Sequence, residues 1–116
     1  KSIHTPGHTP GSTCYYVGDK LIAGDTLFVF GCGRCDMHGG NPEEMFKTLK
    51  NLKSSLDNNT IILPGHDYSV KRESTIEEQI TGNPFMHFQD LNKFVKYRMS
   101  THDKTRISPY DAIYKI

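Results

Sequence analysis

The sequence predicts an α+β fold in which short strands and helices alternate along the chain. Three observations support this prediction. Residues 12–17 and 20–23 are rich in β-branched and aromatic residues and flank a Gly-Asp turn, as two paired strands would. Apolar residues recur at helical spacing after residue 42. A short apolar run at 60–63 has the character of a buried strand.

The middle of the chain is expected to contain a loop and the longest helix. Residues 24–25 end the second strand, residues 26–30 run on from it, and residues 31–40 are dense in glycine. Such a loop is either flexible or held close to a ligand by its backbone. The helix is expected to begin at Asn41, a good cap, followed by Pro42 at the first helical position. Its apolar face comprises Met45, Leu49, Leu52 and Leu56.

The C-terminal third is expected to contain two more helices and a tail. Ser74, with Glu77 three residues later, resembles a capping box at a helix start. The last amphipathic helix is predicted from Leu91, Phe94, Val95 and Arg98. From Ser100 onward the chain is polar with scattered aromatic residues, and no pattern assigns it a structure. We therefore divide the chain into a principal unit, 1–87, and a C-terminal helix and tail, 88–116.

Composition narrows the class of protein. The 116 residues carry 14 Lys and Arg against 13 Asp and Glu, without a long block of either sign. This balance provides no electrostatic basis for binding nucleic acid or an anionic membrane. No apolar stretch is long enough for a bilayer span, and no signal peptide is visible. Three cysteines do not form a disulfide framework, so we expect a cytoplasmic protein. Because the chain opens at Lys1 without a methionine, we expect it to be trimmed or part of a longer protein.

Three polar residues occur in similar local settings. His8 is embedded in Thr-Pro-Gly-His-Thr-Pro-Gly, Asp25 follows a glycine at a predicted strand end, and His66 follows Pro-Gly at another. Glycine beside such a residue lets the backbone bring the side chain close to a shared point. Imidazole and carboxylate are suitable ligands for zinc, iron or manganese. From spacing alone, surface histidines and an ordinary Gly-Asp turn remain open as alternatives.

Four motifs follow one another along the chain: HTPGHTPGS at 4–12, GDTLF at 24–28, GCGR at 31–34 and PGHDY at 64–68. In this order and at this spacing they resemble the glyoxalase II-like branch of the metallo-β-lactamase superfamily. The resemblance implies a four-layer αββα sandwich built from a mixed sheet and flanking helices. Residues 1–87 would supply its C-terminal half.

The resemblance also implies a ligand set and a reaction. His8 matches the family's ligand to a first metal, Asp25 the carboxylate that bridges both metals, and His66 a ligand to the second. The implied cofactor is a pair of zinc ions in the full-length parent, with iron or manganese as alternatives. Water activated by the metals would attack a thioester, and Asp25 would be catalytic through its hold on both ions. The family's His-x-His-x-Asp-His motif is absent from this sequence, so we expect the chain alone to be inactive.

Two further positions match the family's thiol-conjugate binding region, namely Arg34 and Tyr68. The implied partner is a small-molecule thioester such as acylated glutathione, or an acyl thioester on a carrier protein. Asp36 and His87 differ from the glutathione hydrolases, which have an aromatic residue and an arginine there. The Gly-Arg-x-Asp pattern resembles persulfide dioxygenases, which use a single iron, and the loop 35–40 resembles hydrolases of bacterial polyketide clusters. A surface salt bridge for Arg34 and a packed ring for Tyr68 remain open.

Two other classes of function are compatible with the sequence. Cys32 and Cys35 form a C-x-x-C, which suits a redox dithiol or half of a structural zinc site. A zinc site would need a second pair, and Cys14 is the only other cysteine. The absent N-terminal motif also fits a non-catalytic interaction module. A half sandwich would expose an apolar sheet face, so self-association into a homo-oligomer is expected.

Overall fold

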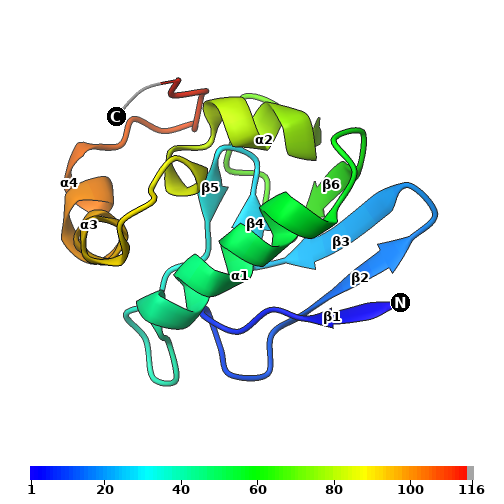
Figure 1. The fold of residues 1–116 in the computed structure, drawn as a ribbon. Helices are drawn as coiled ribbons and strands as arrows, with labels where there is room; N and C mark the ends of the chain where they lie inside the picture. Colours follow the sequence, from blue (N-terminus) through cyan, green and yellow to red (C-terminus); the bar gives the residue numbers. More distant parts are fainter. Residues whose placement is uncertain (115–116) are drawn as a thin grey trace.

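A computed structural model describes residues 1–114 and contains a five-stranded mixed sheet in the order β1-β2-β3-β6-β7 (Figure 1). The central pair, β3 and β6, is parallel, and the other neighbours are antiparallel. A separate two-stranded sheet is formed by β4 and β5. The strands are β1 (Ser2–His4), β2 (Thr13–Val17), β3 (Lys20–Gly24), β4 (Leu27–Phe28), β5 (Gly31–Cys32), β6 (Ile61–Pro64) and β7 (Ser74–Thr75).

Helices cover one face of the sheet and the end that carries β4 and β5 (Figure 1). The longest, α1 (Pro42–Ser55), crosses the sheet and buries Met45, Leu49 and Leu52. The others are α2 (Ile76–Gly82), the short 3-10 helix η1 (Pro84–Met86), α3 (Leu91–Lys96), the π-helical turn η2 (Tyr97–Thr101) and α4 (His102–Thr105). No helix among residues 1–114 has both the length and the apolarity that a membrane crossing requires.

The α+β class is confirmed, and the predicted α1 cap is present. The side chain of Asn41 accepts a hydrogen bond from the backbone N–H of Glu44, and Pro42 opens the helix. This cap satisfies one of the N–H groups that every helix start leaves without an internal partner. Leu56, expected on the apolar face, lies one residue beyond the helix, where it packs against the core as the C-cap.

One local prediction was wrong, and residues 26–30 form a strand only in part. The strand β4 stops at Phe28, because Phe30 adopts a left-handed backbone (φ 62°) and the chain turns back into β5. A contact with another element stabilises that strained conformation, since the N–H of Phe30 donates to the side chain of Gln79 at 2.7 Å. The cap of α2 is Thr75 rather than Ser74, which belongs to β7 and hydrogen-bonds with Gln79 instead.

The residues expected to form a separate helix and tail pack into the common core. Phe94 is fully buried and belongs to the same apolar cluster as Leu21 and Met45. The helical stretch that begins at Leu91 runs without a break to Thr105, beyond the predicted start of the tail. The division of the chain at residue 87 stays a prediction, but 88–114 is not a detached appendage.

One face of the sheet carries large apolar side chains that nothing in the described chain covers. Side chains alternate along a strand, so Cys14 and Leu21 face the core, whereas Tyr15, Val17 and Ile22 face outward. Those three outward side chains are 51%, 60% and 46% exposed, and Tyr15 lies opposite Ile22 in the β2–β3 register. Exposed apolar surface of this kind is typical of a contact surface.

Candidate metal centre

The sheet brings the three predicted ligands together at one edge. Asp25 directly follows β3 and His66 follows β6, and these neighbouring strands are parallel, so both side chains start from the same end of the sheet. His8 reaches the same point from the loop after β1. Oδ1 of Asp25 lies 2.8 Å from Nδ1 of His66, and Oδ2 lies 3.6 Å from Nε2 of His8. The carboxylate therefore stands between two imidazoles.

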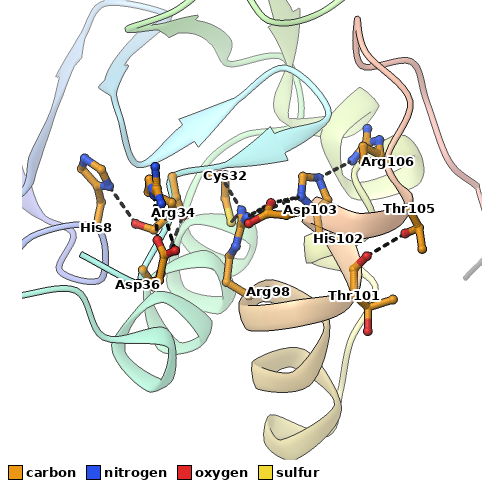
Figure 2. Close-up of polar contacts among 12 residues, drawn as sticks. His8, Cys32, Arg34, Asp36, Arg98, Thr101, His102, Asp103, Thr105 and Arg106 are labelled. Carbon is orange, nitrogen blue, oxygen red and sulfur yellow. Dashed lines mark hydrogen bonds and ion pairs between the residues drawn. The ribbon is translucent and has the colours of Figure 1, made fainter.

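A backbone carbonyl sets the orientation of the His8 ring. Nδ1 of His8 lies 2.8 Å from the carbonyl oxygen of Arg34, and a carbonyl can only accept, so this nitrogen carries the proton (Figure 2). In the neutral ring Nε2 then has a free lone pair directed at the Asp25 carboxylate. A lone pair facing a carboxylate across 3.6 Å fits a cation between them, and a proton fixed on the distal nitrogen is the usual arrangement of a metal-ligating histidine.

Aromatic rings hold the second imidazole. The ring of His66 stacks on Tyr68 with centroids 4.9 Å apart and an angle of 1° between the planes. Phe28 approaches both rings edge-on, at 5.8 Å from His66 and 5.0 Å from Tyr68. Because Nδ1 of His66 contacts the Asp25 carboxylate, Nε2 is the nitrogen left for an ion. Tyr68 therefore supports a candidate ligand as well as bordering the cavity beside it.

Two glycines allow the backbone to close around Asp25. A Cβ on Gly33 would lie 1.9 Å from the Asp25 carbonyl oxygen, and a Cβ on Gly65 would lie 2.7 Å from its Oδ1. Neither glycine is in the left-handed region, so the requirement is close approach rather than backbone freedom. Close approach to Asp25 thus explains Gly33 and Gly65, whereas Gly24, which precedes Asp25, has a left-handed backbone (φ 52°) with open space around it.

Replacing Gly33 by alanine is expected to lower the free energy of unfolding by about 1–3 kcal/mol, because the new methyl group must displace a neighbouring backbone. Gly11→Ala is the matched control, since a Cβ at Gly11 meets nothing within 4 Å. Urea denaturation of the two variants and the parent chain measures the difference. Equal stability of the two variants would contradict the tight packing around Asp25.

The candidate ligands open into a cavity of about 540 Å³. The sequence-predicted residues Arg34 and Tyr68 both line it, so the structure brings all five predicted site residues to one cavity. The sequence reasoning missed the other lining residues, which are Phe28, Cys32, Met37, Arg98, Asp103 and Tyr110. Phe28 and Cys32 lie inside the motifs GDTLF and GCGR, and Arg98 belongs to the last predicted helix, but no local pattern marked Asp103 and Tyr110. A separate cavity between α1 and η1 contains none of the predicted ligands.

The side chain of Arg34 is paired at the rim of the cavity. Its Nε and a terminal nitrogen donate to the two oxygens of Asp36 at 2.7 and 2.9 Å (Figure 2). This two-point hydrogen bond holds the pKa of Asp36 at about 2 and raises the pKa of Arg34. The surface salt bridge that the sequence left open for Arg34 is therefore present, and it coexists with a place on the cavity wall.

The cysteine pair has the environment of core residues. Burial raises the pKa of the Cys32 thiol to about 11 and that of Cys35 to about 12, so neither forms a thiolate readily. The sulfur of Cys32 accepts from the buried guanidinium of Arg98 at 3.7 Å. Within residues 1–114, no group of three or more His, Cys, Asp or Glu side chains is arranged so that it could hold a metal ion as it stands. Asp25 instead contacts His66 at 2.8 Å and lies 3.6 Å from His8, so an ion would have to enter beside these contacts, at Nε2 of each imidazole.

The family assignment follows from the comparison with known sequences. The profile described as "Metallo-beta-lactamase superfamily" matches residues 1–66, a range that ends on His66 and contains all three predicted ligands. The chain belongs to the metallo-beta-lactamase superfamily. It is related to metal-dependent hydrolases of this superfamily.

Curated relatives cover almost all of the chain. A "Probable polyketide biosynthesis zinc-dependent hydrolase BaeB" of Bacillus velezensis is 35% identical over 104 residues, covering 90% of this chain and 46% of the relative. A "Probable hydroxyacylglutathione hydrolase" of Encephalitozoon cuniculi is 34% identical over 115 residues, covering 98% of this chain and 43% of the relative. The chain thus spans less than half the length of these relatives.

Solved structures share the fold. ETHE1 from Myxococcus xanthus superposes with a TM-score of 0.79 and 33% identity, over 84% of this chain and 44% of that one. TTHA1623 in a di-iron-bound form gives a TM-score of 0.67 and 36% identity, over 73% of this chain and 41% of that one. One of these relatives is thus zinc-dependent by name, and one solved structure contains two irons.

Proposed function

We propose that this chain is the C-terminal half of a metal-dependent hydrolase that cleaves thioesters. The observation that carries the proposal is the Asp25 carboxylate held between His8 and His66 at one edge of the sheet, beside an open cavity. The donor set of two imidazoles and one carboxylate suits zinc, and also iron or manganese. An ion held by these residues supplies Lewis acidity, which polarises a carbonyl group and lowers the pKa of water.

The remaining residues of the cavity would bind and orient the substrate. Phe28 and Tyr68 form an apolar wall next to His66, suited to the carbon chain of an acyl thioester. Arg34 presents hydrogen-bond donors at the rim, but Asp36 offsets its charge. This pairing favours a thiol carrier recognised by hydrogen bonds over one recognised by strong anion binding. Small-molecule thioesters and carrier-protein acyl thioesters are both compatible with this cavity. One relative is named a hydroxyacylglutathione hydrolase, and another a zinc-dependent hydrolase of polyketide biosynthesis.

Arg34→Ala in the full-length parent is expected to raise KM by roughly tenfold, the value of one hydrogen bond to a charged group, while kcat and metal content stay unchanged. Tyr68→Phe keeps the ring that stacks on His66 and is expected to change KM without loss of metal. Lys20→Ala, which removes a paired surface cation on β3, is the control. Metal analysis and thioester kinetics are the measurements. If either site variant loses its metal, its residue supports the ion and does not bind substrate.

A second candidate activity is persulfide oxidation at a single iron. The Arg34–Asp36 pair belongs to the Gly-Arg-x-Asp pattern that resembles persulfide dioxygenases, and the fold matches ETHE1. Oxygen uptake by the iron-loaded parent with glutathione persulfide, run beside S-lactoylglutathione hydrolysis, separates the two activities. Oxygen uptake without hydrolysis would replace the thioesterase proposal with this one.

A further inference from the structure

The chain after α4 runs back over the folded core and pairs, by hydrogen bonds, with the loop that contains His66. The N–H of Tyr110 donates to the carbonyl oxygen of Tyr68 at 2.8 Å, and the N–H of Val70 donates to the carbonyl oxygen of Tyr110 at 3.0 Å. The hydroxyl of Ser69 donates to the same oxygen at 2.8 Å. These bonds pair Tyr110 with the loop in the manner of a short parallel bridge. The loop after His66 is therefore fixed by the far end of the chain.

The Tyr110 ring packs closely against several residues beside the cavity. A Cβ on Gly31 would lie 2.8 Å from a ring carbon of Tyr110, so only glycine leaves room for the ring. The Arg106 guanidinium covers the ring at 4.5 Å from its centroid, and His102 and Tyr68 approach it edge-on at 5.5 and 6.2 Å. A guanidinium over an aromatic face is attractive, more so when both groups are partly shielded from water. Tyr110 is thus held on several sides.

The side chain of Arg106 connects the chain after α4 to the core through hydrogen bonds. It donates to the carbonyl oxygens of Phe30 and Asp111 at 2.6 and 3.0 Å. Its other terminal nitrogen lies 3.2 Å from Nε2 of the buried His102 (Figure 2). Burial lowers the pKa of His102 to about 4, so the ring is neutral and accepts this bond. These contacts are specific enough that the segment has one defined position on the body.

The residues that follow Tyr110 also pack closely against the rest of the protein. A Cβ on Gly82 would lie 3.0 Å from the Cβ of Ala112, and the N–H of Ile113 donates to the carbonyl oxygen of Gly82 at 2.8 Å. Glycines on two different elements, Gly31 in β5 and Gly82 in α2, therefore make room for the same tail. A tail that merely rested on the surface would not need both.

We infer that residues 106–113 are an integral part of the candidate metal centre, in which Tyr110 is a positioning residue for His66. Tyr110 fixes the loop that carries Tyr68, Tyr68 stacks on His66, and His66 contacts Asp25. The same Tyr110 ring forms one wall of the cavity. The bonds to the loop come from the Tyr110 backbone, and the packed ring holds that backbone in place. Removing the ring would therefore loosen the loop and let the His66 imidazole lose its orientation. The role in metal affinity rests on the proposed function, whereas the orientation of His66 does not.

The test uses the whole chain with Tyr110→Ala, and Tyr114→Ala as the matched control, because Tyr114 is a tyrosine of the same tail that is 76% exposed. In the metal-free chains, the ring ¹⁵N and ¹H signals of His66 are expected to shift in Tyr110→Ala and stay in place in Tyr114→Ala. Amide exchange at Val70 is expected to accelerate in Tyr110→Ala only. The Zn²⁺ dissociation constant, measured by titration, is expected to rise about tenfold, as when a partner of a metal-ligating histidine is removed.

Gly31→Ala perturbs the ring without removing it and keeps the test valid if Tyr110→Ala folds poorly. The added methyl group is expected to shift the His66 signals in the parent but to add little in a Tyr110→Ala background, since the obstructing ring is gone. Unchanged His66 signals in both Tyr110→Ala and Gly31→Ala would overturn the inference. If the unaltered chain binds no Zn²⁺ while its His66 signals still respond to Tyr110→Ala, the metal proposal fails for this chain and the positioning role stands.

Discussion

Asp25→Ala in the full-length parent is expected to remove nearly all bound metal. The Asp25 carboxylate is the group placed between both imidazoles, with one oxygen 2.8 Å from His66 and the other 3.6 Å from His8. Loss of a histidine's outer partner typically lowers metal affinity by 10–100-fold, so loss of a carboxylate that ligates directly is expected to exceed about a hundredfold. His8→Ala and His66→Ala remove one ligand to one ion and are expected to retain more metal.

Metal content per chain after dialysis is the measurement. Asp19→Ala is the control, because it removes an exposed aspartate that pairs only with the neighbouring Lys20, at a turn far from the sheet edge. Asp25→Asn adds a second comparison, since it keeps the shape of the side chain and removes its charge. Full metal occupancy in Asp25→Ala would disprove the assignment of His8, Asp25 and His66 as a ligand set.

The second prediction with a large expected effect concerns thioester hydrolysis by residues 1–116 alone. Residues 1–116 are expected to show no useful thioester turnover, whereas a longer protein with an upstream His-x-His-x-Asp-His motif is expected to be faster by at least about a thousandfold. A catalytic zinc ion in proteins usually has three protein ligands and one open position. His8, Asp25 and His66 supply three side chains in total, which is too few to hold two ions and leave one position open on each.

The exposed sheet face leads to a related expectation. The outward side chains of Tyr15, Val17 and Ile22 need a cover, which a second sheet layer in a longer protein would provide. We therefore expect residues 1–116 to self-associate, and light scattering measures their mass. The activity assay uses S-lactoylglutathione and acyl-pantetheine with zinc, iron or manganese added. Comparable turnover by the short and long proteins would mean that another residue, such as His38, completes the site.

The sequence by itself determined the features whose causes are local. The cap at Asn41 and the turn between β2 and β3 depend on residues only a few positions apart. The motifs around Asp25 and His66 were recognisable because each contains a glycine with a local requirement. Gly24 adopts a left-handed backbone (φ 52°), and a Cβ on Gly65 would lie 2.7 Å from Oδ1 of Asp25. Local signals do not show the turn at Phe30, whose N–H donates to the side chain of the distant Gln79 while its backbone is left-handed.

Only the tertiary structure decided what completes the cavity. Ser69 and Tyr110 are 41 positions apart and meet through a backbone carbonyl, which has the same chemistry in every residue. No sequence pattern records such a contact, and the polar tail has no apolar periodicity to indicate burial. The position of Tyr110 instead depends on room left by Gly31 and on Arg106, which is fixed by the buried His102. The room for the Tyr110 ring and the residues that contact it come from separate elements, which meet only once the chain has folded. The role of the tail was therefore visible only in three dimensions.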